Sequence, residues 1–242
     1  MKLLDLTLPS PAENLAGDEA LLDWCEAGAG EEVLRFWESP QPFVVVGYAN
    51  KVASEVNVAA CEARGIPILR RCSGGGTVVQ GPGCLNYALI LRIREDGPTR
   101  SISAANQFIM ERNRAAIESA TRHPPSAIRV QGHTDLTLDG LKFSGNAQRR
   151  RRQFLLFHGT LLLDFDLALV GELLHMPSLQ PDYRHRRSHE CFLTLLRIPR
   201  DQVKAALAQA WQADAPLTDT HQPRTTALVA EKYSRAEWNS KF

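Results

Sequence analysis

The residues with the greatest chemical potential lie in three short segments. The first, RRCSGGGTVVQGPG at 70–83, has five glycines in fourteen positions and begins with Arg70 and Arg71. Three consecutive glycines cost folding entropy, so they indicate either a tight turn or a backbone that a ligand must approach closely. Both explanations remain open for this segment alone.

The second segment is GLKFSGNA at 140–147, and the third is FHGT at 157–160. Lys142 is the only lysine between Lys51 and Lys204, in a chain that otherwise uses arginine for positive charge. A lysine presents a compact point charge that can approach one carboxylate or phosphate oxygen. Lys142 is either a solvent-facing strand residue or, beside the small residues S-G-N, part of an anion site. His158 is either a strand histidine satisfied by backbone or a pocket residue.

The glycine segment needs strands on both sides of it. IPILRRC at 66–72 predicts a strand that delivers the two arginines, and TVVQ at 77–80 and CLNYALILRI at 84–93 predict a hairpin joined by Gly-Pro-Gly. Phosphate loops of the dinucleotide-binding and P-loop types open a helix, whereas β-branched residues follow these glycines. The segment therefore belongs to neither type.

The remaining pattern predicts an α+β fold: a mixed, largely antiparallel sheet flanked by helices. Asp139-Gly140 is a strong hairpin signal among the short strands of 127–166. We expect a catalytic domain at 1–200 and a helical tail at 201–242. Further strands are predicted as a pair at 31–39 and 42–50, and helices at 14–28, 54–65, 101–121 (with Ile102, Phe108, Ile109 and Ile117 on a buried face), 167–176, 201–211 and 225–239.

Composition restricts the class of protein. The 242 residues are 44% hydrophobic and 23% charged, which is ordinary for a globular protein, and the net charge of +1 provides no overall field for nucleic acid or anionic membrane. The N-terminus lacks a signal-peptide pattern and no apolar run approaches eighteen residues, so a cytoplasmic location is expected. The five cysteines are scattered without CxxC spacing, which indicates reduced thiols and neither a disulfide framework nor a zinc site.

Together with NLAGDEALL and EEVLRFWESPQPFVVVGYAN near the N-terminus, the three segments resemble, in order, the lipoate-protein ligase catalytic domain of the biotin/lipoate ligase and octanoyltransferase superfamily. The resemblance covers about residues 12–170. It implies an enzyme that activates lipoate or octanoate with ATP and Mg²⁺ to an acyl-adenylate, then transfers the acyl group to a lysine of a lipoyl carrier domain.

The resemblance also implies roles for individual residues. Lys142 is the catalytic candidate, stabilising charge at the acyl carbonyl and the α-phosphate. Arg70 is expected to line the adenylate pocket, and the glycine triplet to wrap the acyl tail and acyl phosphate. The full set of expected binding residues is Arg70, Arg71, Ser73, Gly74, Gly75, Gly76, Thr77, Asn86, Asp135, Ser144, Gly145, Asn146, His158, Gly159 and Thr160. Mg²⁺ is expected to be held partly by phosphates, and the sequence does not identify its protein ligands.

Other members of the superfamily remain alternatives. Octanoyltransferases use a cysteine thioester in place of ATP, and QGPG at 80–83 is more like them than like ligases. The nearest thiol downstream of Lys142 is Cys191, which we interpret as a core or helix thiol, with His189 close enough in sequence to lower its pKa. A biotin ligase is disfavoured because its loop reads G-R-G-R. A non-catalytic acyl-binding or carrier-binding subunit is the third alternative.

Three further features concern the carrier domain and the cover of the pocket. Arg149 to Arg152 form either a solvated charge cluster or a docking strip for an acidic carrier domain. Bacterial lipoate ligases often carry an additional C-terminal domain that closes over the adenylate, whereas only about seventy residues follow the core here. We therefore expect either a separate accessory protein or a reduced lid formed by the tail. PDYRHRRSHECF at 181–192 is interpreted as a polar surface loop, with folding over the pocket as the alternative.

Overall fold

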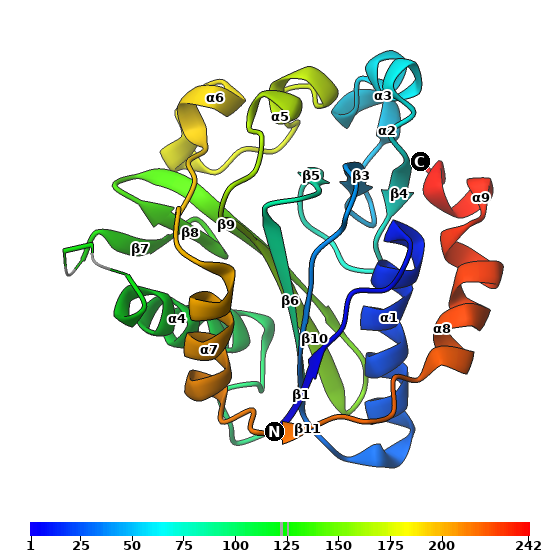
Figure 1. Cartoon of the computed structure of the whole chain (residues 1–242), viewed down its shortest axis with the longest axis vertical. Helices are drawn as coiled ribbons and strands as arrows, with labels where there is room; N and C mark the ends of the chain where they lie inside the picture. Colours follow the sequence, from blue (N-terminus) through cyan, green and yellow to red (C-terminus); the bar gives the residue numbers. More distant parts are fainter. Residues whose placement is uncertain (122, 125) are drawn as a thin grey trace.

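A central eight-stranded sheet organises the molecule. The computed structural model describes residues 1–121, 123–124 and 126–242. Within them the strand order is β11-β1-β2-β6-β10-β9-β8-β7, with β1 parallel to both of its neighbours and every other pair antiparallel. The predicted mixed, largely antiparallel sheet is thus confirmed (Figure 1). The strands are β1 (Lys2–Asp5), β2 (Val33–Trp37), β6 (Cys84–Arg92), β7 (Ile128–Gln131), β8 (Asp135–Leu138), β9 (Leu141–Arg150), β10 (Phe154–Leu162) and β11 (Ala215–Pro216).

A second sheet of three strands carries the glycine segment. Its order is β4 (Ile68–Arg70), β3 (Phe43–Val46) and β5 (Val78–Gln80). The predicted hairpin of 77–80 with 84–93 is therefore wrong, because β5 pairs with β3 while β6 pairs with β2 and β10. The chain crosses between the sheets at Gly83, which has φ +86° and would place a Cβ 2.3 Å from the Asp164 carbonyl oxygen. The strands predicted as a pair at 31–39 and 42–50 likewise lie in different sheets.

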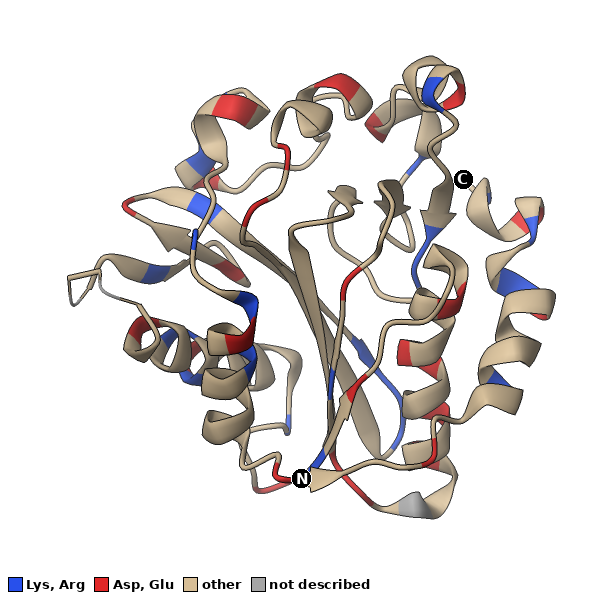
Figure 2. Cartoon of the chain, viewed as in Figure 1, with Lys and Arg blue, Asp and Glu red and all other residues tan. Residues whose placement is uncertain are grey.

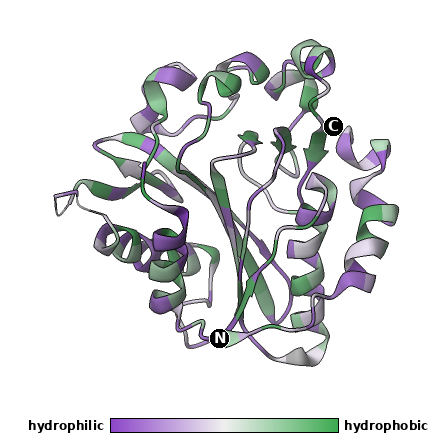
Figure 3. Ribbon diagram, viewed as in Figure 1, coloured by the Kyte–Doolittle hydropathy of each residue, from purple (hydrophilic) through white to green (hydrophobic). Residues whose placement is uncertain are grey.

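Helices cover both faces of the large sheet. Figure 1 shows α4 (Ile102–Ser119) and α7 (Arg200–Trp211) on one side and α1 (Pro11–Trp24) on the other. Along β6, Leu85 and Leu89 belong to the core under α4 and α7, whereas Ala88 and Ile90 pack with α1. A strand buried on both faces reads as a continuous apolar run, as this one does. Hydrophobic and hydrophilic stretches alternate along the flanking helices (Figure 3).

Local signals fixed several boundaries. Ser10 caps α1 in a reciprocal capping box with Glu13, and Ser101 caps α4. Asp139 and Gly140 both have positive φ, 50° and 80°, as the predicted Asp-Gly hairpin turn requires. Ile102, predicted on the buried face of α4, is 57% exposed because it lies in the first helical turn. Short elements complete this part: η1 (Cys25–Ala29), α2 (Val52–Glu55), α3 (Val58–Arg64), α5 (Ala168–Leu173), η2 (Asp182–Arg184) and α6 (His189–Phe192).

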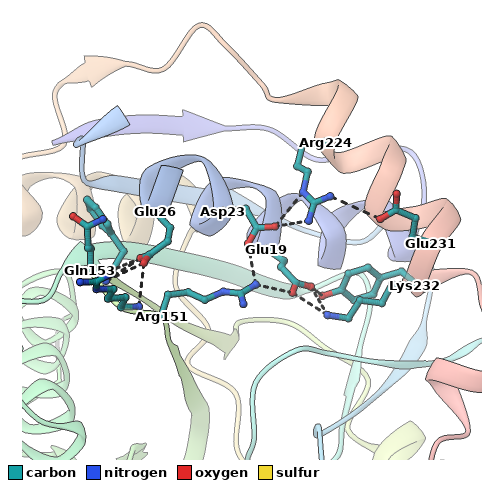
Figure 4. A network of polar contacts seen from close by, with 11 residues as sticks. Glu19, Asp23, Glu26, Arg151, Gln153, Arg224, Glu231 and Lys232 are labelled. Carbon is teal, nitrogen blue, oxygen red and sulfur yellow. Dashed lines mark hydrogen bonds and ion pairs between the residues drawn. The ribbon is translucent and has the colours of Figure 1, made fainter. Parts of the chain in front are cut away.

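The C-terminal segment packs against the domain at several places. β11 extends the large sheet, and α8 (Gln222–Leu228) with η3 (Val229–Tyr233) lies along α1. Acidic bands on α1 face basic bands on this segment (Figure 2). Lys232 Nζ donates to both carboxylate oxygens of the buried Glu19, and Arg224 pairs with Asp23 at 2.7 Å (Figure 4). The final helix is α9 (Ala236–Asn239), and none of the helices described is long and apolar enough to cross a bilayer.

Candidate active site

A cavity of about 350 Å³ lies where the three-stranded sheet meets β9, β10 and the segment 174–193. Most of the residues predicted as a site converge on it. The predicted residues that line the cavity are Arg71, Gly75, Gly76, Thr77, Asn86, Asp135, Lys142, Ser144, Gly145, Asn146, His158, Gly159 and Thr160. Lys142, the glycine loop and the FHGT segment therefore line the same cavity, although they are far apart in the sequence.

Lys142 is held in this cavity by an ion pair. Its Nζ lies 2.8 Å from Asp135 Oδ1, and the side chains are 23% and 13% exposed. The Tyr183 hydroxyl donates to the other oxygen of Asp135 at 2.6 Å. The Lys142 backbone is also fixed, because its carbonyl accepts a hydrogen bond from the Thr194 amide. The ammonium is placed by three separate chain segments.

Gly145 leaves the space that the lysine side chain occupies. A Cβ at this position would lie 2.9 Å from both Cε and Nζ of Lys142. Gly159 has a similar function on the neighbouring strand, since a Cβ there would overlap the side-chain amide of Asn146. That amide donates to the Thr134 carbonyl at 2.6 Å and accepts from the Tyr87 hydroxyl. The glycines of S-G-N and H-G-T thus give room to functional side chains rather than forming turns.

Arg71 holds the glycine segment in place by hydrogen bonds to its backbone. This buried guanidinium donates to the carbonyls of Gly74 and Gly76, and burial lowers the pKa of Arg71 to about 10. Gly75 has φ +86°, a conformation that favours glycine, and a Cβ on Gly47 would lie 2.0 Å from the Gly75 carbonyl oxygen. Gly76 meets nothing within 4 Å at its Cβ position and lines the cavity. The loop therefore combines a backbone turn with an open face.

Ser73, His158 and Asp18 form a chain of contacts below the loop. Ser73 Oγ lies 2.6 Å from His158 Nε2, and His158 Nδ1 lies 3.2 Å from Asp18 Oδ2. The order of atoms matches a serine–histidine–aspartate triad. However, Ser73 is 1% exposed, does not line the cavity, and its Oγ also accepts a hydrogen bond from Arg71 Nε. This chain consequently ties the glycine loop to β10 and α1 and offers no accessible nucleophile.

Asp18 continues this chain to a buried arginine. Arg35 Nη1 lies 2.6 Å from Asp18 Oδ1, and the two side chains are 1% and 2% exposed. The same guanidinium donates to the backbone carbonyls of Leu6 and Asn14 and to the side-chain oxygen of Asn14. A buried charge pair needs such additional donors and acceptors to offset its desolvation. The inner wall of the cavity is therefore fixed to α1 and β2.

Arg70 does not line the cavity, contrary to expectation. Its buried guanidinium donates to the carbonyls of Gly47, Tyr48, Asn50 and Asn239, and its Nε to that of Trp238. Trp238 Nε1 donates in return to the Arg70 carbonyl at 2.8 Å. All three guanidinium nitrogens of Arg70 thus donate to backbone carbonyls, and the side chain is fully buried outside the cavity. Ser73 and Gly74 also lie outside the lining residues.

The segment 174–193 forms one wall of the cavity, so PDYRHRRSHECF folds over the pocket rather than lying apart as a surface loop. Pro181, Arg184, His189 and Phe192 line the wall. Arg184 is 4% exposed and packs its guanidinium over the Phe192 ring at 4.6 Å. Sequence reasoning missed Asp18, Trp37, Tyr183 and Arg184; the crowding of arginine and histidine in 184–189 was the available signal for the last.

The cysteines are distributed away from the cavity. Cys25, Cys61, Cys72 and Cys84 are buried, and burial raises the pKa of Cys72 to about 12. Cys191 is an exposed residue of α6, which makes it a helix thiol and not a core one. None of the five lines the cavity. No group of three or more His, Cys, Asp or Glu residues able to hold a metal ion occurs in the described part of the chain.

The arginine run does not form one uniform surface. Arg150 donates to the Thr99 carbonyl, and Arg151 pairs with Asp23 at 2.9 Å, while Arg152 is exposed (Figure 4). Arg151, directly after β9, therefore contacts α1. A docking role for the run stays a prediction.

The model of the lipoyl protein ligase A/B catalytic domain matches residues 10–212. Octanoyltransferase LipM of Geobacillus kaustophilus is 28% identical over 99% of this chain and 98% of its own length. A putative lipoate-protein ligase A of Aeropyrum pernix is 33% identical over 71% of this chain and 61% of its own.

Solved structures agree on the fold. A structure from a Thermoplasma acidophilum lipoylation system, described as a bipartite lipoate protein ligase and its E2 lipoyl domain, superposes with a TM-score of 0.83 at 22% identity, over 99% of this chain and 95% of the other. A lipoate-protein ligase A bound with ATP gives 0.79 at 25% identity, over 99% and 98%. With most of its length matched by the family model, the chain belongs to the lipoyl protein ligase A/B catalytic domain family.

Proposed function

We propose that this protein transfers an octanoyl or lipoyl group to the side-chain amine of a lysine on a lipoyl carrier domain. The observation that carries the proposal is the position of Lys142, whose ammonium enters a cavity lined by Gly75, Gly76 and Thr77. The cavity volume of about 350 Å³ suits a medium-length acyl chain with part of its donor.

The chemistry requires stabilisation of one developing charge. The carrier amine attacks the acyl carbonyl, a C–N bond forms, the bond from carbonyl carbon to the leaving group breaks, and the amine loses its proton. Negative charge gathers on the carbonyl oxygen in the transition state. A preorganised donor such as the Lys142 ammonium typically contributes about 3–4 kcal/mol to such a step.

An octanoyl thioester on a carrier protein is the first proposed donor. Support comes from the octanoyltransferases that resemble this chain over nearly its whole length. In this reaction the thiol leaves and no ATP is consumed. If a cysteine carries the acyl group transiently, Cys191 is the candidate, since it is exposed and lies two residues before Leu193, which bridges to the Lys142 strand.

ATP-dependent ligation of free lipoate or octanoate is the second candidate. It is favoured by one observation, that no cysteine of the chain lines the cavity. Lys142, Arg71 and Arg184 provide positive charge for a phosphate there. The donor set fits a nucleotide whose Mg²⁺ is held mainly by phosphates, because the described residues offer no carboxylate cluster. When bound, ATP supplies the activated acyl phosphate.

One experiment separates these reactions. A lipoyl domain is incubated with the protein and either octanoyl thioester without ATP, or octanoate or lipoate with Mg-ATP, and its mass is measured. Modification in the first mixture supports the transferase, and modification with pyrophosphate release in the second supports the ligase. No modification in either mixture contradicts transfer by this single chain, and it leaves a non-catalytic binding subunit or an enzyme that needs a separate accessory protein.

Two variants sharpen the result. Lys142→Ala is expected to lose at least about 100-fold in the active mixture. Cys191→Ser is expected to abolish transfer only if a thioester forms on that sulfur. Activity of the single protein in the same assay shows that no separate accessory protein is needed.

A further inference from the structure

Asp135 has two carboxylate oxygens with different partners. Oδ1 pairs with Lys142 Nζ at 2.8 Å, and Oδ2 accepts from the Tyr183 hydroxyl at 2.6 Å. The terminal torsion of an aspartate is broad and has no strongly preferred value. Its orientation must therefore come from its partners, and the only one opposite the lysine among the described contacts is Tyr183.

Lys142 depends on Asp135 in turn. A lysine side chain has a flexible four-carbon stem, so its nitrogen has no position fixed by the backbone alone. The described hydrogen bonds and ion pairs give Nζ one partner, the Asp135 carboxylate. Gly145 provides room beside the stem but no polar contact. The direction of the ammonium therefore follows the orientation of Asp135.

Tyr183 itself is well fixed by its surroundings. Its ring packs on Phe192, with centroids 5.3 Å apart, and lies close to Gly132, where a Cβ would be 3.4 Å from Cε1. Arg187 donates to the Tyr183 carbonyl and to the Gly140 carbonyl, which connects the segment to the β8–β9 turn. Burial and the nearby Asp135 raise the pKa of Tyr183 well above its ordinary value, so the hydroxyl remains a donor.

We propose that Tyr183 is a positioning residue, which orients Asp135 by a hydrogen bond to Oδ2 and thereby holds the Lys142 ammonium toward the acyl carbonyl. This inference rests on the proposed function for the acyl group and extends it to a residue outside the cavity lining. Tyr183 touches no reacting atom. Tyr183 affects the position of Lys142 only through the Asp135 carboxylate. Its effect on kcat is therefore expected only when that carboxylate is present.

The test uses a double-mutant cycle of Tyr183→Phe and Asp135→Asn in the full chain. Tyr183→Phe keeps the ring contacts, and we expect kcat to fall about 10-fold with KM for donor and carrier changed less than about 2-fold. In the Asp135→Asn background the same change is expected to have no further effect. A matched control is Tyr48→Phe, which removes a hydroxyl that accepts a hydrogen bond from Lys241 outside the cavity and should leave kcat unchanged.

A second measurement does not depend on enzymatic activity. The rate at which acetic anhydride labels Lys142 is compared with that of Lys51 by peptide mass spectrometry. Because a fixed ion pair protects the ammonium, Tyr183→Phe and Asp135→Asn are each expected to raise Lys142 labelling at least about 2-fold relative to wild type. Faster labelling in a protein without acyl-transfer activity supports the positioning and contradicts the proposed function.

Unchanged labelling of Lys142 in Tyr183→Phe overturns the inference. So does an equal loss of kcat from Tyr183→Phe in the wild-type and Asp135→Asn backgrounds, because that result means an action independent of Asp135. Thermal unfolding of each variant accompanies the cycle. A kcat loss that tracks a lower melting temperature across the variants, without the predicted non-additivity, also counts against positioning.

Discussion

Gly145→Ala tests whether the lysine needs the space that this glycine leaves. The new Cβ would lie 2.9 Å from Lys142 Nζ and Cε, whereas an ordinary contact begins at 3.4 Å, so the lysine must move by about 0.5 Å. Gly145 lies in β9 at a conformation without positive φ, so alanine introduces no backbone strain there. The displaced group is the end of a flexible side chain, and the cost in folding free energy is therefore small, below about 1 kcal/mol.

The expected effect is on catalysis. A displacement of this size weakens the ion pair to Asp135 and moves the ammonium from the carbonyl oxygen, and we expect kcat to fall by about 10- to 100-fold. Steady-state transfer to a lipoyl domain measures the effect, and urea unfolding measures stability. Gly171→Ala in α5 is the matched control, since its Cβ meets only Glu190 Oε1 at 3.8 Å and alanine favours a helix by about 0.5–1 kcal/mol.

The contrary outcome is a Gly145→Ala variant with wild-type kcat and native stability. That outcome means that the resting position of Lys142 is not the one used in the reaction. A large loss of stability with a proportional loss of active protein also contradicts the prediction, because the expected effect is on the position of Lys142 and not on the folding of β9. Gly171→Ala must keep full activity for either comparison to count.

Three further predictions concern the periphery of the site. Arg70→Met removes the donors to five backbone carbonyls, of which that of Gly47 is buried and the other four are partly buried, and is expected to lower the free energy of unfolding by at least about 3 kcal/mol in urea titrations, a smaller loss contradicting the assigned contacts. Burial lowers the pKa of His189 below its ordinary 6.5, so the stability that neutral His189 contributes is present above pH 6.5 and is lost as the pH falls toward the lowered pKa. His189→Gln is expected to reduce this loss of unfolding free energy in acid, by at most about 1.4 kcal/mol per pH unit. Replacing the arginines at 149–152 with serine is expected to slow transfer to the carrier at low salt while leaving reaction with a free amine unchanged, and equal carrier kinetics would remove the docking role.

Much of the fold follows from local signals in the sequence. The helix at 101–121 and the Asp139-Gly140 turn are present, because caps and turn residues act within a few positions. The single helix predicted at 54–65 is wrong: α2 ends at Glu55 and α3 begins at Val58, because Val56 is extended and bridges to Leu174, although the predicted stop at Gly65 is confirmed. Strand partners were less accessible. The misplaced hairpin at 77–93 depends on Gly83 packing against the Asp164 backbone, a contact across eighty residues that no local pattern contains.

The site shows the same division. Lys142 and the glycine loop stand out because their residue types are unusual for their position, whereas Asp135 was named only through the family resemblance; all of them line one cavity. Arg70, which the resemblance placed in the adenylate pocket, lies outside the cavity lining because its guanidinium contacts Trp238 and Asn239, residues far away in the sequence. Tyr183 was missed because a single tyrosine in a polar segment has no pattern before the chain folds.

The buried pair of Arg35 and Asp18 has a consequence for how this protein can diverge. Either substitution alone leaves an uncompensated charge in the interior, at a cost of about 3–5 kcal/mol, whereas an apolar replacement of both can be neutral. Gly17 belongs to the same unit, since a Cβ there would lie 3.0 Å from the guanidinium. Related proteins that differ at one of these three positions are therefore expected to differ at the others as well, because each single substitution destabilises the fold.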